Sequence, residues 1–315
     1  MSRHRRAAAR RRSLGIVPLV VVAMGAGVLL ARLSPDAPPP VRAPEPAVRP
    51  AAPPRARPPA ARPSPTPTPR PQRATPVSPA HTPRGRLAVV FDDAGGDLAH
   101  VEAIIAIGRP VTVAVLPFLA HSDEVAQRAR AAGLEVLVHL PLEPEDPGKD
   151  PGPGSITVAM SDAQIRQAVR AALAAVPGAV GMNNHMGSRA TADRRVMRAV
   201  LQAARDAGAF FLDSYTTPHS VVREVAAELG VRTATRAIFL DNVDDDAAIA
   251  AQVRRAIARA RQEGAVIAIG HAQRRTPAVV AAMRHEFDEA GVALVPLSAL
   301  MGGMPAPASE GRKSP

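Results

Sequence analysis

Residues 87–96 of this 315-residue chain read LAVVFDDAGG. A run of five apolar residues is typical of a buried strand, and two aspartates and a glycine-rich turn follow it directly. Later in the chain the same order recurs: an apolar run ends, polar residues follow, and an amphipathic helical pattern begins. The carboxyl ends of parallel strands share one rim, so polar groups that follow different strands converge there. The pattern therefore predicts a parallel α/β domain with a single site at its rim.

The repetition of this pattern indicates the fold class. Stretches rich in Ala, Arg and Glu separate the apolar runs, and several end in a glycine, which is a common helix stop. Seven or eight β/α units predict one α/β domain, built as a closed or nearly closed (β/α) barrel of seven or eight parallel strands. A doubly wound open sheet is the alternative. The apolar runs are residues 87–91, 111–116, 134–140, 179–182, 209–212, 237–240, 265–269 and 292–296.

The first 33 residues have the composition of a membrane-targeting segment. Residues 1–13 hold six arginines and no acidic residue, and residues 14–31 form an uncharged apolar run of 18 residues. That length is about the minimum for a membrane-spanning helix, and a preceding basic segment keeps its charges on the cytoplasmic side. We expect residues 1–33 to anchor the chain in the inner membrane of the cell envelope, with the globular domain outside the cytoplasm. A cleaved signal peptide and a secreted protein are the alternative.

A linker and a tail are expected to flank the barrel. Of the 34 prolines, 19 lie between residues 34 and 83, mixed with Ala, Arg, Ser and Thr. Proline removes backbone donors and large apolar residues are scarce here, so residues 34–84 are predicted to be a disordered, semi-extended linker. We expect the barrel to occupy residues 85–305 and residues 306–315 to be a disordered tail.

The positive charge of the chain does not belong to its globular part. Residues 1–84 contain 15 arginines and two acidic residues, a net charge of +13, whereas the whole chain carries +11. The remaining residues therefore carry −2, which argues against nucleic acid as a partner of the barrel.

Cysteine is absent, which excludes thiol catalysis and zinc–sulfur sites and leaves His, Asp, Glu and Asn as candidate metal ligands.

Asp92 and Asp93 follow the first apolar run. Side chains alternate along a strand, so both carboxylates face the mouth of a barrel only if the chain turns there. Residues 94–96, Ala-Gly-Gly, are expected to supply that turn. One carboxylate would then bind a metal while the other acts as a base. A solvated turn with an acidic helix cap is the alternative.

Further polar residues follow the later runs. His139 ends the third run, and Glu143 follows four residues on, where Pro141 requires a tight turn to bring the two together. Residues 183–185, Asn-Asn-His, follow the fourth run and offer two amides and an imidazole to a polar ligand. Asp213 and Ser214 come after the fifth run, and His271 after the seventh.

Five strings of residues carry a family resemblance: 91–95 (FDDAG), 138–144 (VHLPLEP), 183–188 (NNHMGS), 212–214 (LDS) and 270–271 (GH). On these strings, residues 86–301 resemble the divergent (YibQ-like) polysaccharide deacetylases, within the polysaccharide deacetylase superfamily. The resemblance implies a distorted (β/α) barrel that removes N- or O-acetyl groups from sugars with a divalent metal, usually zinc.

The resemblance also implies roles for individual residues. Asp92 matches the catalytic base and Asp93 the metal-binding aspartate. His139 matches the first histidine of the metal pair, and His271 matches the late histidine that acts as general acid.

This chain departs from the superfamily pattern at two places. Glu143 stands where a second metal histidine is usual, and the Asn-Asn-His string replaces an Arg-x-Pro segment, so either His185 or Glu143 must complete the metal site. The expected substrate is an acetylated glycan or a peptidoglycan fragment. The residues expected to contact it are Asn183, Asn184, Asp213 and Ser214.

Two other functions remain open from the sequence. The altered metal positions, the low content of aromatic residues (2%) and the absence of tryptophan favour a tethered envelope protein that binds glycan or protein without turnover. A glycosidase needs two separated carboxylates, for which Asp92 and Asp213 are the candidate pair.

Overall fold

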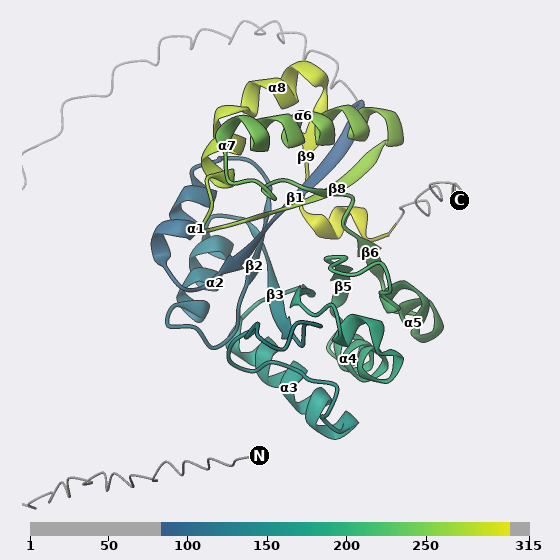
Figure 1. Cartoon of the computed structure of the whole chain (residues 1–315). Coiled ribbons are helices and arrows are strands. Elements are labelled where there is room, and N and C mark those ends of the chain that lie inside the picture. Colours follow the sequence, from purple (N-terminus) through teal and green to yellow (C-terminus); the bar gives the residue numbers. More distant parts are fainter. Residues whose placement is uncertain (1–82, 303–315) are drawn as a thin grey trace, which may run out of the picture. The chain divides into compact units, whose positions relative to one another are not determined.

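The computed structural model describes residues 83–302 (Figure 1). The expected membrane segment, the tail at residues 306–315 and all but the last two residues of the expected linker lie outside the described residues. Within residues 83–302 no helix is long and apolar enough to cross a membrane.

Within residues 83–302, nine parallel strands form one curled sheet at the centre of the domain. Eight of them follow the order β6-β5-β4-β3-β2-β1-β8-β7, and β9 pairs with the beginning of β1. The curled parallel sheet fits the predicted (β/α) barrel. The strands are β1 (Gly85–Ala94), β2 (Thr112–Val115), β3 (Glu135–Leu142), β4 (Gly181–Met186), β5 (Phe210–Asp213), β6 (Thr233–Thr235), β7 (Ile238–Phe239), β8 (Ala265–His271) and β9 (Val292–Leu294).

Helices cover the outer face of this sheet (Figure 1). Ser161 begins α3 with a capping box that includes Gln164, and Gly264 ends α6 in the left-handed conformation. The helices are α1 (Leu98–Ile105), α2 (Ser122–Ala131), α3 (Asp162–Ala175), α4 (Arg194–Asp206), α5 (Val222–Leu229), α6 (Asp246–Glu263), α7 (Thr276–Ala282) and α8 (Arg284–Ala290), with 3-10 turns η1 (Ala190–Ala192) and η2 (Leu297–Leu300).

One extended segment connects the two ends of the strand order. β6 pairs with β5 and β7 pairs with β8, although only two residues separate β6 from β7 in the chain. At this junction the backbone N–H of Arg236 donates to Asp213, and that of Ala237 donates to Ile267. The segment therefore changes partner along its length, and the barrel is distorted at this point. β6 is a strand that the sequence did not predict.

Two apolar layers fix the sheet. The outer core lies between the sheet and the helices, and a smaller inner core fills the barrel. Along β1, β3 and β8 the inner core includes Val90, Leu137 and Ile269, while Leu297 and Leu300 of η2 join it from the C-terminal segment. Because side chains alternate along a strand, the position two residues beyond each inner-core residue also points into the barrel.

Gly181 at the start of β4 offers a test of this inner packing. A Cβ atom at Gly181 would overlap the ring of Phe210, which is 1% exposed and has no room to move. We expect Gly181→Ala to lower the free energy of unfolding by about 1–3 kcal/mol in urea denaturation. Gly96→Ala is the matched control, because its Cβ would come no closer than 3.9 Å to Leu119. Equal stability of the two variants would contradict this packing.

Candidate metal centre

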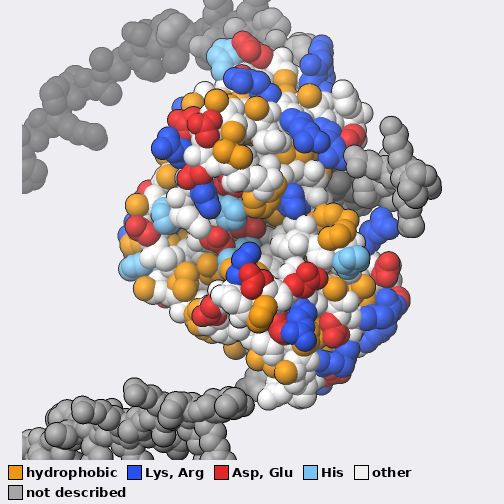
Figure 2. Space-filling view, viewed as in Figure 1, with side chains coloured by type: hydrophobic (Ala, Val, Ile, Leu, Met, Phe, Trp, Pro, Cys, Tyr) orange, Lys and Arg blue, Asp and Glu red, His pale blue; other side chains and the backbone are white. Residues whose placement is uncertain are grey.

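The inward positions above the inner core are polar. Asp92, His139 and His271 each lie two residues beyond an inner-core residue on β1, β3 and β8. Asn183 and His185 are two residues apart on β4 and therefore face the same side. The predicted convergence of strand ends is thus present in the structure. Figure 2 shows acidic and histidine side chains gathered around a hollow near the middle of one face of the domain.

Asp93 joins this layer through an irregularity in β1. Alternation would turn its side chain away from the barrel, but its backbone has a φ of 61°, in the left-handed region. The pairing of β1 with β2 shifts register between Phe91 and Ala94, around the same residue. The irregularity that brings both aspartates inward therefore begins at Asp93, one residue before the expected turn at residues 94–96, in which Gly95 also has a positive φ of 121°.

Three side chains converge closely enough to hold a metal ion: Asp93, His139 and His185. Oδ1 of Asp93 lies 2.9 Å from Nδ1 of His185 and 3.1 Å from Nε2 of His139, and the two nitrogens are 3.2 Å apart. In a tetrahedral zinc site with bonds of about 2.0–2.1 Å, ligand atoms are about 3.3 Å apart. The triangle therefore has the dimensions of three ligands of one small cation.

The hydrogen bonding of Asp93 supports this interpretation. Its Oδ2 accepts from the side-chain amide of Gln273 at 3.0 Å. Its Oδ1 is buried and, among the residues that the structure describes, has no hydrogen-bond partner of acceptable geometry, despite the two nearby imidazoles. A buried carboxylate oxygen without a donor is unfavourable unless another positive group neutralises it. A cation bound by the three side chains would do so.

Asn183 orients His139 for this role. The amide oxygen of Asn183 lies 2.9 Å from Nδ1 of His139, and its Nδ2 donates to Oδ1 of Asp92 at 2.7 Å. Because that amide nitrogen is the donor to Asp92, the amide oxygen is left to accept from His139. Nδ1 then carries a proton, which leaves Nε2, the nitrogen that faces Asp93, as the one available to a cation. Such outer contacts commonly fix the tautomer of a metal-binding histidine.

The pKa values of the two aspartates are shifted in opposite directions. Burial raises the pKa of Asp92, and His139 and Asn183 offset this only in part. Burial acts in the same sense on Asp93, but the contacts with His139 and His185 outweigh it and hold the pKa of Asp93 below its ordinary value. Opposite shifts in neighbouring carboxyls favour separate roles, with Asp93 as the permanent anion and Asp92 as the proton acceptor.

When the cluster has no cation, His139 carries a second proton and its imidazole is positively charged. Burial opposes a positive charge on this imidazole, but Asp92 and Asp93 outweigh burial and raise its pKa to about 9. Because a ligand imidazole must be neutral, a cation that binds here displaces that proton.

His271 stands beside the cluster and is oriented by a carboxylate that the sequence analysis missed. Nδ1 of His271 lies 3.0 Å from Oδ1 of Asp241, whose Oδ2 accepts from the backbone N–H of His271 and from Thr276. Nε2 of His271 is then free to face Oδ2 of Asp93, 3.8 Å away. Asp241 directly follows the apolar run 237–240, so the signal that identified the other residues was present here too.

Glu143 lies outside this cluster. Its Oε2 accepts from the backbone N–H of Val158 at 2.6 Å, and its Oε1 pairs with Arg189 at 2.9 Å. β3 continues through Pro141 to Leu142, so Glu143 lies four extended residues, or about 13 Å, beyond His139. Of the two residues expected to complete the site, the structure brings His185, and not Glu143, to Asp93 and His139.

The residues expected to contact the substrate are buried and engaged with protein groups. Asn183 holds His139 and Asp92, whereas Asn184 points the other way from β4 and accepts from the backbone N–H of Ser214 at 2.8 Å. Both carboxylate oxygens of Asp213 accept hydrogen bonds, from the Tyr215 backbone and from Ser220. The hydrogen bonds of these side chains therefore stabilise the rim from inside the protein.

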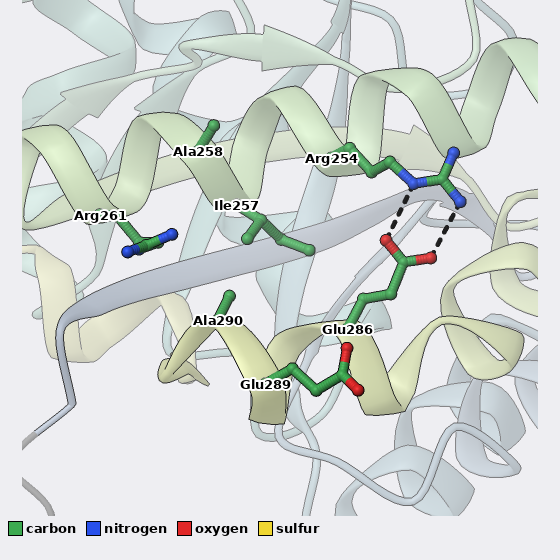
Figure 3. Close-up of a pocket in the computed structure, with 7 residues that line it drawn as sticks. All are labelled: Arg254, Ile257, Ala258, Arg261, Glu286, Glu289 and Ala290. Carbon is green, nitrogen blue, oxygen red and sulfur yellow. Dashed lines mark hydrogen bonds and ion pairs between the residues drawn. The ribbon is translucent and has the colours of Figure 1, made fainter.

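A separate groove of about 310 Å³ lies between α6 and α8 in the outer helical layer (Figure 3). Its main charged groups neutralise each other, since Arg254 makes two hydrogen bonds of 2.9 Å to the carboxylate of Glu286. The remaining lining residues include no histidine and no pair of buried carboxylates. Titratable groups are buried together at the rim and not in this groove, so the rim is the candidate site.

Comparison with known proteins identifies a family and related chains. The family described as divergent polysaccharide deacetylase matches residues 89–301. An uncharacterised protein of Haemophilus influenzae is 40% identical over 206 residues, covering 65% of this chain and 73% of its own length. The uncharacterised protein YibQ of Escherichia coli K12 is 37% identical over 218 residues, which cover 69% of this chain and 67% of YibQ.

A solved structure shares the fold. An uncharacterised protein of Agrobacterium tumefaciens C58 superposes with a TM-score of 0.66 at 24% identity, covering 70% of this chain and 91% of that one.

The cluster predicts which carboxylate binds metal. Purified full-length protein, stripped with chelator and then loaded, is expected to retain about one zinc or cobalt ion and to melt at a higher temperature when loaded. Asp93→Asn removes a charged ligand and is expected to abolish both effects. Glu143→Gln is the control and is expected to leave metal uptake unchanged. Metal content is measured by elemental analysis, and loss of uptake in Glu143→Gln alone would contradict the assignment.

Proposed function

This chain belongs to the divergent polysaccharide deacetylase family, and from that premise we propose that it is a metal-dependent hydrolase that removes acetyl groups from a glycan of the cell envelope. The observation that carries the proposal is the convergence of Asp93, His139 and His185, in which Oδ1 of Asp93 is buried and finds no hydrogen-bond donor of good geometry within residues 83–302. Asp92 and His271 lie beside this cluster, as a base and an acid would.

Asp93, His139 and His185 would hold the metal. Two imidazole nitrogens and one carboxylate oxygen, with no sulfur, suit zinc and other divalent first-row metals. When bound, such a metal supplies Lewis-acid activation of water and of the acetyl carbonyl. The protein contributes three ligand atoms from Asp93, His139 and His185. Asn183 keeps the proton of His139 on Nδ1, so that Nε2 is available to the metal.

Asp92 is the proposed general base. Its carboxylate is buried, lies next to the metal ligand Asp93 in the chain, and is held by the amide of Asn183. Burial raises its pKa, which makes the carboxylate a stronger base than an exposed aspartate. It accepts the proton of the water whose oxygen forms a bond to the acetyl carbon.

His271 is the proposed general acid. Burial disfavours its charged form, but the contact with Asp241 outweighs burial and raises its pKa, so a larger fraction is protonated near neutral pH. Asp241 also fixes the ring so that Nε2 faces the cluster. As the bond from the acetyl carbon to the sugar nitrogen or oxygen breaks, His271 donates a proton to the leaving atom and acetate is released.

The proposal predicts acetate release that depends on Asp92. Full-length protein loaded with zinc or cobalt is incubated with acetylated chito-oligosaccharides or peptidoglycan fragments, and acetate is measured enzymatically. Asp92→Asn is expected to lower the rate by about 10²–10⁴-fold, because it removes the base while leaving the three metal ligands. Asp206→Asn, an exposed acidic residue at the end of α4, is the matched control.

The same assay separates the proposal from a binding function. If the wild-type protein takes up metal and binds these glycans but releases no acetate, a tethered glycan-binding role replaces catalysis. Release that is equal in wild type and Asp92→Asn would remove Asp92 from the mechanism.

We also propose that the domain is held at the outer face of the inner membrane. The arginine-rich residues 1–13 followed by the apolar residues 14–31 support this location. Full-length protein is expected to sediment with membranes and to resist carbonate extraction, and deletion of residues 14–31 is expected to release it. Recovery of the full-length protein in the soluble fraction would contradict the anchor.

A further inference from the structure

The aromatic residues of this chain are few and unevenly placed. The chain has six phenylalanines, one tyrosine and no tryptophan. Four phenylalanines are buried in the cores, and Phe239 is half-buried against His271. The other two aromatic side chains, Phe118 and Tyr215, are 44% and 45% exposed. Phe118 follows the carboxyl end of β2 and Tyr215 that of β5, so both stand at the rim that carries the metal cluster.

Tyr215 is exposed because its backbone is held in place. Its φ of 52° lies in the left-handed region, which is unfavourable for a tyrosine. Its backbone N–H donates to Asp213 at 2.8 Å, and its carbonyl accepts from Arg236 at 3.2 Å. Arg236 also donates to the carbonyl of Ser214 at 2.8 Å. The buried Asp213 and the partly buried Arg236 thus stabilise a strained turn that presents the ring to solvent, and such strain is commonly found at functional sites.

Phe118 is presented in a similar way. Its φ is 65°, and Ser122 fixes the surrounding turn by accepting from the backbone N–H of Leu119 and donating to the carbonyl of Leu116. The ring lies directly against Gly154, where a Cβ atom would overlap it. One part of the ring therefore packs against the backbone at Gly154 while the rest faces solvent.

The two rings flank the metal cluster. The strand order is β5-β4-β3-β2, and the ligand histidines His185 and His139 lie on β4 and β3, between the strands that lead to Tyr215 and Phe118. At about 4.8 Å between neighbouring strands, three steps separate the two strand ends by about 14 Å along the sheet. This span is longer than one sugar ring.

We infer that Phe118 and Tyr215 are fixed stacking platforms on either side of the metal cluster, and that the site takes an oligosaccharide chain lying across both. The inference rests on the proposed function and names the residues that would hold the glycan on either side of the reacting sugar unit. The apolar faces of sugar rings pack on aromatic faces, and a rigid platform loses little conformational entropy when it binds. A monosaccharide at the cluster would not reach both rings.

The intrinsic fluorescence of Tyr215 can report the binding of an oligosaccharide at this ring. Tyr215 is the only tyrosine and the chain lacks tryptophan, so the intrinsic tyrosine fluorescence of the full-length protein comes from this residue. The probes are N-acetylglucosamine oligomers from monomer to hexamer and their deacetylated counterparts. The background is Asp92→Asn, so that the probe is not consumed. We expect a saturable change in fluorescence for the longer oligomers, an affinity that rises with chain length until both rings are covered, and no saturable change for the monomer.

Variants test the two platforms separately by calorimetry. Phe118→Leu keeps an apolar side chain against Gly154 but removes the aromatic face, and Tyr215→Ser removes the second ring. Each is expected to weaken hexamer binding by roughly three- to ten-fold, as for the loss of one aromatic contact. Tyr215→Phe keeps the ring and is expected to retain affinity. Val180 directly precedes β4, at the opposite end of the barrel, and is 43% exposed. Val180→Ala removes an exposed apolar side chain far from the rim and is the matched control.

The outcomes separate this inference from the proposed function. Equal binding of monomer and hexamer, unchanged hexamer affinity in Phe118→Leu and Tyr215→Ser, or no response to any oligomer would overturn the oligosaccharide platforms. Acetate release without length dependence would overturn them while leaving the hydrolase intact. Length-dependent binding without acetate release would support the platforms and contradict the catalytic proposal. Folding of each variant is verified by its metal uptake.

Discussion

The candidate site depends on the left-handed backbone of Asp93. A regular strand would direct Asp92 and Asp93 to opposite faces of the sheet, so that only one carboxylate would enter the barrel. The register shift between β1 and β2 and the φ of 61° place both carboxylates inside, next to His139 and His185. The left-handed conformation costs a non-glycine residue about 1–2 kcal/mol. Within residues 83–302, Oδ1 of Asp93 has no well-aligned hydrogen-bond donor, so unless a cation binds, only the nearby imidazoles of His139 and His185 offset its charge.

Around this irregular residue the site is otherwise regular. Inward positions on β1, β3, β4 and β8 place an aspartate, two histidines, an asparagine and a third histidine in one layer above the inner core. The buried amide of Asn183 connects two of the strands, because it contacts His139 on one side and Asp92 on the other. The proposed base Asp92 and the proposed metal ligand His139 are therefore oriented by one side chain, and Asp241 orients the proposed acid His271. The arrangement of carboxylates and imidazoles is set by strand alternation and by these two buried polar residues.

Much of this could be predicted from the sequence, because apolar runs that end in polar residues are a local pattern. The pattern located Asp92, His139 and His271 at one rim, and applied to Asp241 it would have located the partner of His271 as well. Alternation could also have shown that Asn183 and Asn184, as neighbours on one strand, face opposite sides. Three features depend on tertiary contacts that no local pattern reports: the turn at Asp93, the short strand β6, and the choice between His185 and Glu143. Glu143 shares the chemistry of a ligand, but β3 remains extended beyond His139 and carries it to Val158 and Arg189.

The central claim is that one divalent cation is bound by two imidazoles and one carboxylate. X-ray absorption spectroscopy of the zinc-loaded full-length protein tests it most directly, because scattering within an imidazole ring reports the number of histidine ligands. The account predicts a nitrogen- and oxygen-bound zinc with two imidazoles, and one fewer imidazole in either His139→Asn or His185→Asn. Zinc bound with two imidazoles in His185→Asn, or with a single imidazole in the wild-type protein, would contradict it.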